Sequence, residues 1–199
     1  MALPPNLIFD LGGVLYGIDF DRSVQALSEM AGGDREVEVY RSLREDDFWN
    51  AFETGALDAT GFRDRVRTRF GLDHGDSELD AAWNALLLGV LPGREAALEQ
   101  LAKQHRIVLL SNTNPIHVQY LQGQCAGLFS FMEKCFFSYE MGLRKPDPRI
   151  FKQVFAEMDW KPEDCLFVDD SVSNVRAAQE LDFQVFHFPK NNPGFLLND

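Results

Sequence analysis

The stretch LIFDLGGVLYGIDF, residues 7–20, joins a short apolar run to one carboxylate and two consecutive glycines. The run LIFD (7–10) is too short for a helix and has no alternation of polar and apolar residues, so it predicts a strand buried on both faces. Asp10 ends this strand, and Gly12 follows two residues later. Because ligands of parallel sheets gather at the carboxyl ends of strands, Asp10 is a candidate nucleophile or metal ligand.

Similar apolar runs recur along the rest of the chain. Further strands are predicted at 107–114, 134–138, 165–170 and 184–188. Apolar residues at helical spacing predict helices between them, at 94–104, 148–158 and 173–181. Strands that alternate with helices of this length indicate an α/β fold with a Rossmann-like parallel sheet and right-handed crossovers.

Residues 20–92 break this alternation. Amphipathic patterns predict four helices in this segment, at about 21–31, 36–53, 59–70 and 77–90, and no strand is predicted there. The chain is therefore predicted to have a sheet core, residues 1–18 and 92–199, and an all-helical cap inserted after the first strand, residues 19–91. Because the insertion leaves from the strand end that carries Asp10, the cap can cover that edge of the sheet.

Composition narrows the classes of partner. The 199 residues carry a formal net charge of −12, which argues against nucleic acid and anionic membranes as main partners. An anionic ligand would need a metal ion or local cations. The three cysteines form no CxxC pair, and there is no leader-like N-terminus or membrane-length apolar run. We therefore expect a cytoplasmic protein with no nucleic-acid or membrane partner.

Four segments carry the chemistry: FDLGGVL, LSNTN, GLRKPDPRIF and FVDDSVSNV, in this order. Together they resemble the motifs of the haloacid dehalogenase-like hydrolases, in the branch whose helical cap follows the first motif. The resemblance covers the whole chain and is strongest to small bacterial sugar-phosphate phosphatases, including those acting on glucose 1-phosphate. It implies a magnesium-dependent hydrolase of a small-molecule phosphomonoester, a sugar phosphate first of all, that works through an aspartyl-phosphate intermediate.

The resemblance assigns roles in phosphoryl transfer to four residues. Asp10 would be the nucleophile, because a carboxylate is ionised at pH 7 without an activating base. Ser111, with the backbone amide of Asn112, would hold a phosphoryl oxygen. Lys145 would pair with the nucleophile and the transferred phosphoryl group. Asn114 is more typical of a turn in this polar segment than of a substrate ligand.

A magnesium site is implied at the same edge. Two adjacent carboxylates at a buried strand end, Asp169 and Asp170, are unfavourable without a cation. By resemblance, magnesium would be bound by Asp10, the Gly12 carbonyl and Asp170, with Asp169 bound directly or through water. Asn174, one helical turn further on, would orient the acidic pair or the lysine.

Gly12 departs from the usual pattern of these phosphatases. The family places a second aspartate there, which protonates the leaving oxygen and then activates water. Glycine keeps the carbonyl but lacks the acid, and loss of a positioned acid or base typically costs about 10²–10⁴-fold in rate. Asp19 is the nearest candidate to replace it, although it fits a helix N-cap better. Two other readings stay open: a metal-independent 2-haloacid dehalogenase, and a catalytically silent binding protein with this fold.

Substrate specificity is expected to come from the cap. Phe48, Trp49 and Arg63 are candidates to face a substrate, together with arginines at 65, 67 and 69, most of which should be solvated. The four histidines lie apart without metal-ligand spacing and are interpreted as surface or core residues.

Overall fold

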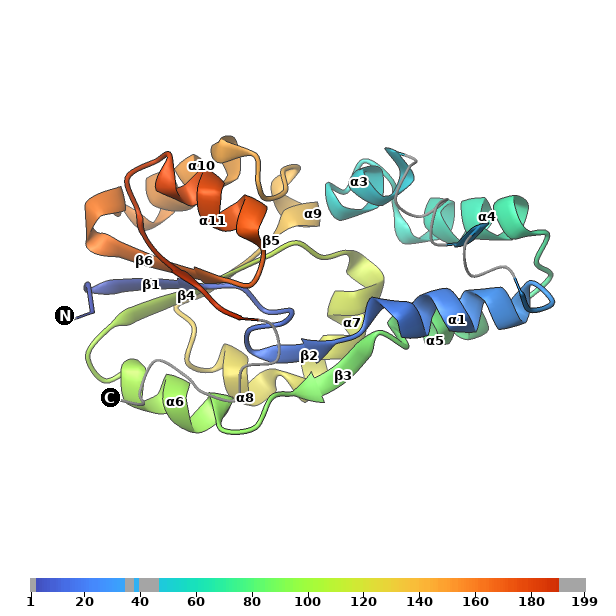
Figure 1. The fold of residues 1–199 in the computed structure, drawn as a ribbon, viewed down its shortest axis with the longest axis horizontal. Coiled ribbons are helices and arrows are strands. Elements are labelled where there is room, and N and C mark those ends of the chain that lie inside the picture. Colours follow the sequence, from blue (N-terminus) through green and yellow to red (C-terminus); the bar gives the residue numbers. More distant parts are fainter. Residues whose placement is uncertain (1–2, 35–37, 40–46, 190–199) are drawn as a thin grey trace.

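The computed structural model describes residues 3–34, 38–39 and 47–189 and contains a five-stranded parallel sheet in the order β5-β4-β1-β6-β7 (Figure 1). Its strands are β1 (Asn6–Phe9), β4 (Arg106–Ser111), β5 (Lys134–Phe137), β6 (Cys165–Asp169) and β7 (Gln184–His187). The central strand β1 pairs on both sides, with Ile8 opposite Val108 in β4 and Phe167 in β6. The predicted Rossmann-like sheet is confirmed.

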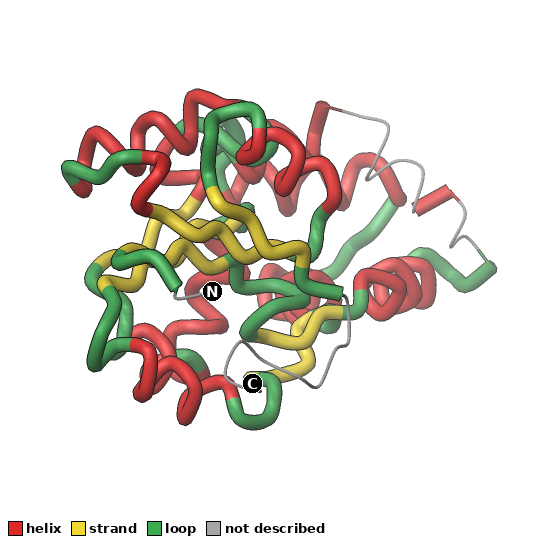
Figure 2. The backbone as a smooth tube through the Cα atoms, turned by 60° about the vertical axis from the view of Figure 1, so that its left-hand side comes forward, coloured by secondary structure: helices red, strands yellow, loops and turns green. Residues whose placement is uncertain are grey.

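Helices cover both faces of this sheet (Figures 1 and 2). They are α6 (Arg94–Leu101), α7 (Pro115–Gln124) and α8 (Ala126–Phe129) on one face, and α10 (Pro148–Met158) and α11 (Val172–Gln179) on the other. Leu7 and Phe9 pack into the first layer and Ile8 into the second, which is why the strand is a continuous apolar run. No helix in the described ranges combines the length and apolar character needed to cross a bilayer.

The boundaries of the sheet core follow the expected pattern with a few differences. The predicted helix 148–158 matches α10, where Asp147 caps the first turn and Pro148 occupies the first helical position. The predicted strand 107–114 is too long, because β4 ends at Ser111. Asn114 accepts a hydrogen bond from the His117 amide and starts α7, a helix that the sequence patterns missed. The short α9 (Ser138–Met141) and 3₁₀ turn η1 (Pro162–Asp164) complete the core.

The inserted segment forms a helical module with its own apolar core. Its helices are α1 (Phe20–Met30), α3 (Asp47–Glu53), α4 (Ala59–Phe70) and α5 (Asp76–Asn84). The rings of Phe52 and Phe62 stack with centroids 4.1 Å apart, and Ile116 of α7 joins the same cluster. Half of the predicted helix 36–53 lies outside the described residues, which show helix at 38–39 and 47–53.

The expectation of no strand in residues 20–92 is wrong. The predicted helix 77–90 ends at Asn84, and Leu87–Val90 form β3, which pairs antiparallel with β2 (Tyr16–Ile18). Gly89 has φ 123°, a backbone conformation that a helix does not contain. This two-stranded ribbon carries the chain to and from the helical module (Figure 1).

Candidate active site

Residues from three adjacent strands meet at the carboxyl edge of the sheet. Asp10, Ser111 and Asp169 stand at the ends of β1, β4 and β6, which are neighbours in the strand order. Lys145 enters from the loop before α10. Its Nζ lies 2.9 Å from Asp10 Oδ1 and 2.7 Å from Asp169 Oδ2. The tertiary structure thus brings together two of the predicted acids and the predicted cation.

Lys145 is a fully charged group inside the protein. Its residue is only 1% exposed, and its ammonium also donates to the Leu110 carbonyl at 2.8 Å. Burial by itself lowers the pKa of Lys145, but the charges of Asp10 and Asp169 outweigh burial, and the pKa is raised. The ammonium therefore stays protonated and neutralises part of the acidic edge.

Asp10 has a perturbed acidity. Burial raises the pKa of its carboxyl to about 7, and the nearby charge of Asp169 adds to this, while Lys145 opposes it. The Leu11 amide donates to Asp10 Oδ1 at 2.8 Å. A group so placed favours a further cation beside it, because a positive charge stabilises the ionised form that a nucleophile needs.

The acidic cluster has the donor chemistry of a magnesium site. Carboxylate oxygens of Asp10, Asp169 and Asp170 lie within 4.8 Å of one another. Oxygen ligands in such a group are the ones that Mg²⁺ prefers. Gly13, with φ +76°, permits the close approach of Asp170, because a Cβ there would lie 2.3 Å from Asp170 Oδ2. The residues present therefore fit a magnesium ion.

Asp169 is already occupied by protein donors. Its Oδ1 accepts from the Ser171 amide at 2.8 Å, and its Oδ2 accepts from Lys145. The side-chain amide of Asn174 lies 3.1 and 3.0 Å from the two oxygens. Asn174 thus orients this carboxylate, as expected from the sequence.

Asn112 contributes a contact that the sequence patterns did not reveal. Its side chain donates to the Lys145 carbonyl and accepts from the Lys145 amide, both at 2.8 Å. This paired hydrogen bond holds the loop that delivers the ammonium. Ser111, 3% exposed, lies beside it and lines the adjoining cavity.

The space beside Gly12 is filled by an apolar side chain. A Cβ on Gly12 would lie 3.1 Å from Ile18 Cδ1. Asp19, the candidate replacement for the missing acid, instead caps α1 by accepting from the Asp21 amide at 3.2 Å, and its side chain is 46% exposed. The N-cap interpretation of Asp19 agrees with this geometry.

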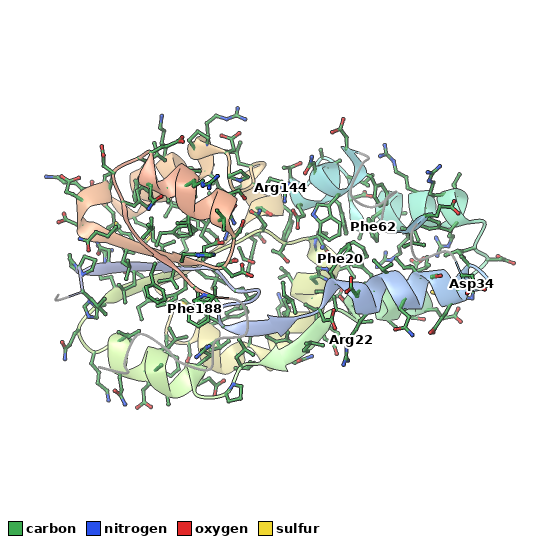
Figure 3. All side chains as sticks on the ribbon, in the orientation of Figure 1. Phe20, Arg22, Asp34, Phe62, Arg144 and Phe188 are labelled. Carbon is green, nitrogen blue, oxygen red and sulfur yellow. The ribbon has the colours of Figure 1, made fainter. Side chains whose placement is uncertain are left out.

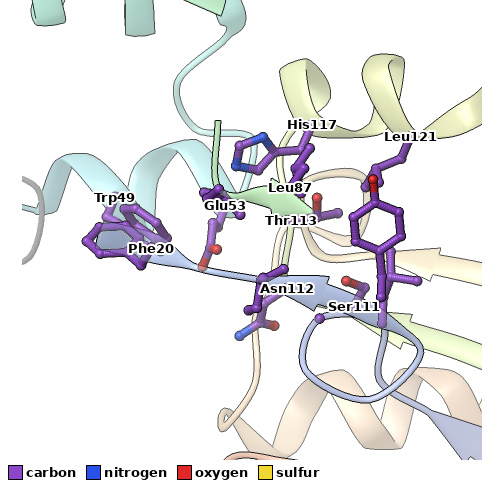
Figure 4. A pocket seen from close by; sticks show the side chains of 14 residues that line it. Phe20, Trp49, Glu53, Leu87, Ser111, Asn112, Thr113, His117 and Leu121 are labelled. Atoms are coloured by element: carbon purple, nitrogen blue, oxygen red, sulfur yellow. The ribbon is translucent and has the colours of Figure 1, made fainter. Parts of the chain in front are cut away.

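Two cavities lie between this edge and the helical module, and Figure 4 shows the inner one. The inner cavity, of about 130 Å³, is bordered by Gly12, Ser111 and Asn112 on the sheet side and by Trp49 on the module side. The outer cavity, of about 480 Å³, shares Trp49 and adds Arg144. Both are large enough for part of a small organic molecule.

Of the cap residues expected to face a substrate, only Trp49 borders these cavities. Phe48 is buried in the core of the module and stacks on Phe62. The Arg63 guanidinium binds Asp80 through two hydrogen bonds, of 2.8 and 2.7 Å. The prediction that Phe48 and Arg63 face a substrate is therefore wrong. The Phe48 side chain packs between helices of the module, and the Arg63 side chain is held in an ion pair with Asp80. The Arg65 guanidinium lies over the Phe48 ring, and Arg67 forms an ion pair with Asp76.

His117 is a buried histidine that joins the module to the core. Its ring stacks on Trp83 with centroids 5.2 Å apart, and its Nδ1 lies 2.7 Å from Asn84 Oδ1. Because the amide oxygen only accepts, Nδ1 is the protonated nitrogen. Burial lowers the pKa of His117 to about 3, so the ring is neutral at pH 7. Its interpretation as a core residue is correct, although it also borders the inner cavity.

The low pKa of His117 predicts loss of stability in acid. The unfolded ring takes up a proton below the ordinary histidine pKa of 6.5, whereas the folded ring stays neutral to about pH 3. Stability is thus fully present above pH 6.5 and falls towards pH 3, by about 4–5 kcal/mol in total for this group. Urea unfolding at pH 7.5 and 5 should show a difference between the wild type and His117→Gln of about 2 kcal/mol. An equal change of the free energy of unfolding with pH in both proteins would contradict this prediction. His105→Gln is the control variant, and its pH dependence should be that of the wild type.

Comparison with known proteins shows the family to which this sequence is similar. The family model described as haloacid dehalogenase-like hydrolase matches residues 6–182. A D-ribitol-5-phosphate phosphatase of Bacteroides thetaiotaomicron is 30% identical over 194 residues, 94% of this chain and 92% of that protein. A crystal structure of a HAD family enzyme from the same organism, in complex with magnesium and inorganic phosphate, has a TM-score of 0.86 at 29% identity, covering 96% of both chains. An L-2-haloacid dehalogenase from Xanthobacter autotrophicus shares the fold, with a TM-score of 0.64 at 22% identity over 92% of this chain and 76% of that one.

Proposed function

Because the chain belongs to the haloacid dehalogenase-like hydrolase family, we propose that it is a magnesium-dependent phosphomonoester hydrolase acting on a small sugar or polyol phosphate. The observation that carries this proposal is the Lys145 ammonium, which lies 2.9 Å from Asp10 and 2.7 Å from Asp169 at an edge that Asp170 completes. Such an arrangement of one cation among three acids suits a phosphoryl group and a divalent ion.

The residues of the site divide the work of phosphoryl transfer. Asp10 attacks phosphorus in line and forms an aspartyl-phosphate while the bond from phosphorus to the ester oxygen breaks and the alcohol leaves. Lys145 neutralises charge on the transferred group, and Ser111 with the amide of Asn112 holds a phosphoryl oxygen. Asp169 acts chiefly by orienting Lys145, since protein donors already occupy both of its oxygens.

We propose that magnesium is bound by Asp10, Asp170 and the Gly12 carbonyl. Asp169 would bind the ion either directly or through a water molecule. When bound, the ion supplies positive charge that orients and polarises the phosphoryl group. A magnesium complex of the structural relative supports this assignment.

Residues 19–91 are proposed to act as the cap over this site. The β2–β3 ribbon stands at both ends of that segment, and the two cavities lie between the segment and the sheet. The substrate's organic part would occupy these cavities beside Trp49. The 30% identical ribitol-phosphate phosphatase supports a polyol or sugar chain as that part.

The alternative of a metal-independent dehalogenase is less well supported. It shares the fold with the Xanthobacter enzyme, but that likeness concerns the fold alone. Three clustered carboxylates favour a divalent cation, and a haloacid is itself an anion that would be repelled without one.

A panel of phosphomonoesters, run with Mg²⁺ and with excess chelator, tests the proposed function. We expect inorganic phosphate to be released from sugar and polyol phosphates only with Mg²⁺, and chelation to lower the rate by at least about 10²-fold. Halide release from a 2-haloacid in chelator would favour the dehalogenase instead. Thermal stabilisation by phosphate esters with no turnover of any of them would favour a silent binding protein.

A further inference from the structure

Glu53 lies where the two cavities meet. It ends α3 and borders the inner cavity together with Gly12, Ser111 and Asn112 (Figure 4). It also borders the outer cavity. The residue is only 6% exposed. A buried carboxyl thus shares a cavity with the position at which the second acid of the family is missing.

Core residues hold Glu53 in this place. Its Oε2 lies 2.8 Å from Nε of Arg144, the residue before Lys145 in the chain. Arg144 also donates to Asn50 Oδ1 at 2.6 Å, and Figure 3 shows it on the core side, facing the module. Gly55, with φ +70°, lets the turn after α3 touch the core, because a Cβ there would lie 2.3 Å from the Tyr139 carbonyl oxygen.

The buried oxygen of Glu53 has an unmet hydrogen-bonding capacity. Oε2 forms the ion pair with Arg144 Nε and accepts no further hydrogen bond from the described residues. A proton on this carboxyl, shared with a substrate oxygen in the cavity, would use the remaining hydrogen-bonding capacity of this atom.

The other ionisable groups around these cavities are unsuited to proton transfer at neutral pH. Burial raises the pKa of Tyr16 to about 12, and its hydroxyl donates to Gln124 at 2.6 Å. Burial lowers the pKa of His117 to about 3, so its ring is neutral at pH 7, and Arg144 is ion-paired with Glu53 itself. Burial raises the pKa of Glu53 above its ordinary value, although the charge of Arg144 and a hydrogen bond from Trp49 oppose the shift.

On this geometry, and resting on the proposed phosphatase function, we propose that Glu53 is the proton-transfer group that replaces the acid missing at Gly12. As an Asp10 oxygen bonds to phosphorus, the bond from phosphorus to the ester oxygen breaks, and the Glu53 carboxyl gives that oxygen its proton. The alcohol leaves. Water then attacks the phosphorus of the aspartyl-phosphate and gives a proton to the Glu53 carboxylate. The bond to Asp10 breaks, inorganic phosphate leaves, and Glu53 is again protonated.

The test compares Glu53→Gln with the wild type on two esters in Mg²⁺, D-ribitol 5-phosphate and p-nitrophenyl phosphate. Nitrophenolate leaves as a stable anion, whereas the ribitol alkoxide needs a proton. We expect kcat/KM for release of the alcohol to fall by about 10²–10⁴-fold on the ribitol ester and by less than about tenfold on the aryl ester. Equal losses on both esters, or no loss on the ribitol ester, would overturn the inference.

Two further variants keep this test decisive. Glu53→Asp retains a carboxyl, so the ratio of its rates on the two esters should stay closer to that of the wild type, whether or not the glutamine variant folds well. Asp19→Asn removes the competing acid and keeps a good N-cap, and should leave both rates unchanged. A wild type that hydrolyses neither ester would overturn the proposed function itself, and the role of Glu53 with it.

Discussion

Asp10→Asn should abolish magnesium-dependent phosphomonoester hydrolysis, with kcat lowered by about 10⁴-fold or more. An amide cannot attack phosphorus as a carboxylate does, and the change also removes one negative charge from the acidic cluster. Release of inorganic phosphate from a sugar phosphate measures the loss. Acid quenching of the wild type with ³²P-labelled substrate should trap labelled protein, and the variant should carry no label.

Asp19→Asn is the matched control for this change. It makes the same chemical replacement at a half-exposed N-cap, where asparagine also accepts the amide of the first turn. Its activity and label should equal those of the wild type. Substantial turnover by the Asp10 variant would refute the assignment of Asp10 as nucleophile.

Lys145→Met should cost both activity and stability. Without the ammonium, Asp10 and Asp169 face each other across a buried space with no neutralising charge. Removing one partner of a buried charge pair typically destabilises a protein by about 3–5 kcal/mol. At this chain length we expect Tm to fall by roughly 6–20 °C and kcat by about 10²–10³-fold.

Addition of Mg²⁺ should restore part of the stability that the Lys145→Met variant loses. Mg²⁺ should raise the Tm of the Lys145 variant more than that of the wild type, because a divalent cation replaces the lost ammonium beside the same carboxylates. Scanning calorimetry with and without Mg²⁺ measures this. Lys152→Met, at an exposed position of α10, is the control and should leave Tm unchanged. An unaltered Tm in the Lys145 variant would show that the buried pair contributes no net stability.

Local patterns were sufficient for most of the sheet core. The apolar runs ending at Asp10 and Asp169 form buried strands, and the helix that follows Asp147 has the bounds expected from its proline and capping residue. These local patterns gave a wrong prediction at Leu87–Val90, a strand whose apolar spacing also fits a helix. The strand partner of that segment is Tyr16–Ile18, far away in the chain, and no local pattern reports such pairing.

The active-site prediction divides in the same way. That Asp10, Ser111, Lys145 and the acidic pair belong to one site could be read from their positions after apolar runs and from their motifs. The side-chain bond of Asn112 to the Lys145 backbone could not, because it joins two loops 33 residues apart. Glu53 had no signal of its own, since one glutamate at the end of a helix is ordinarily solvated.

The sequence alone thus determined which groups are available at the sheet edge, because chain order and strand polarity already direct the ends of parallel strands to one edge. The resemblance to the family added that Gly12 stands where a second acid is usual. Only the tertiary structure decided that Ile18 occupies the space beside Gly12 and that Glu53 is buried against Arg144. Both facts depend on how the helical module packs against the sheet core, and burial, which sets acidity, is a property of that packing rather than of any local motif.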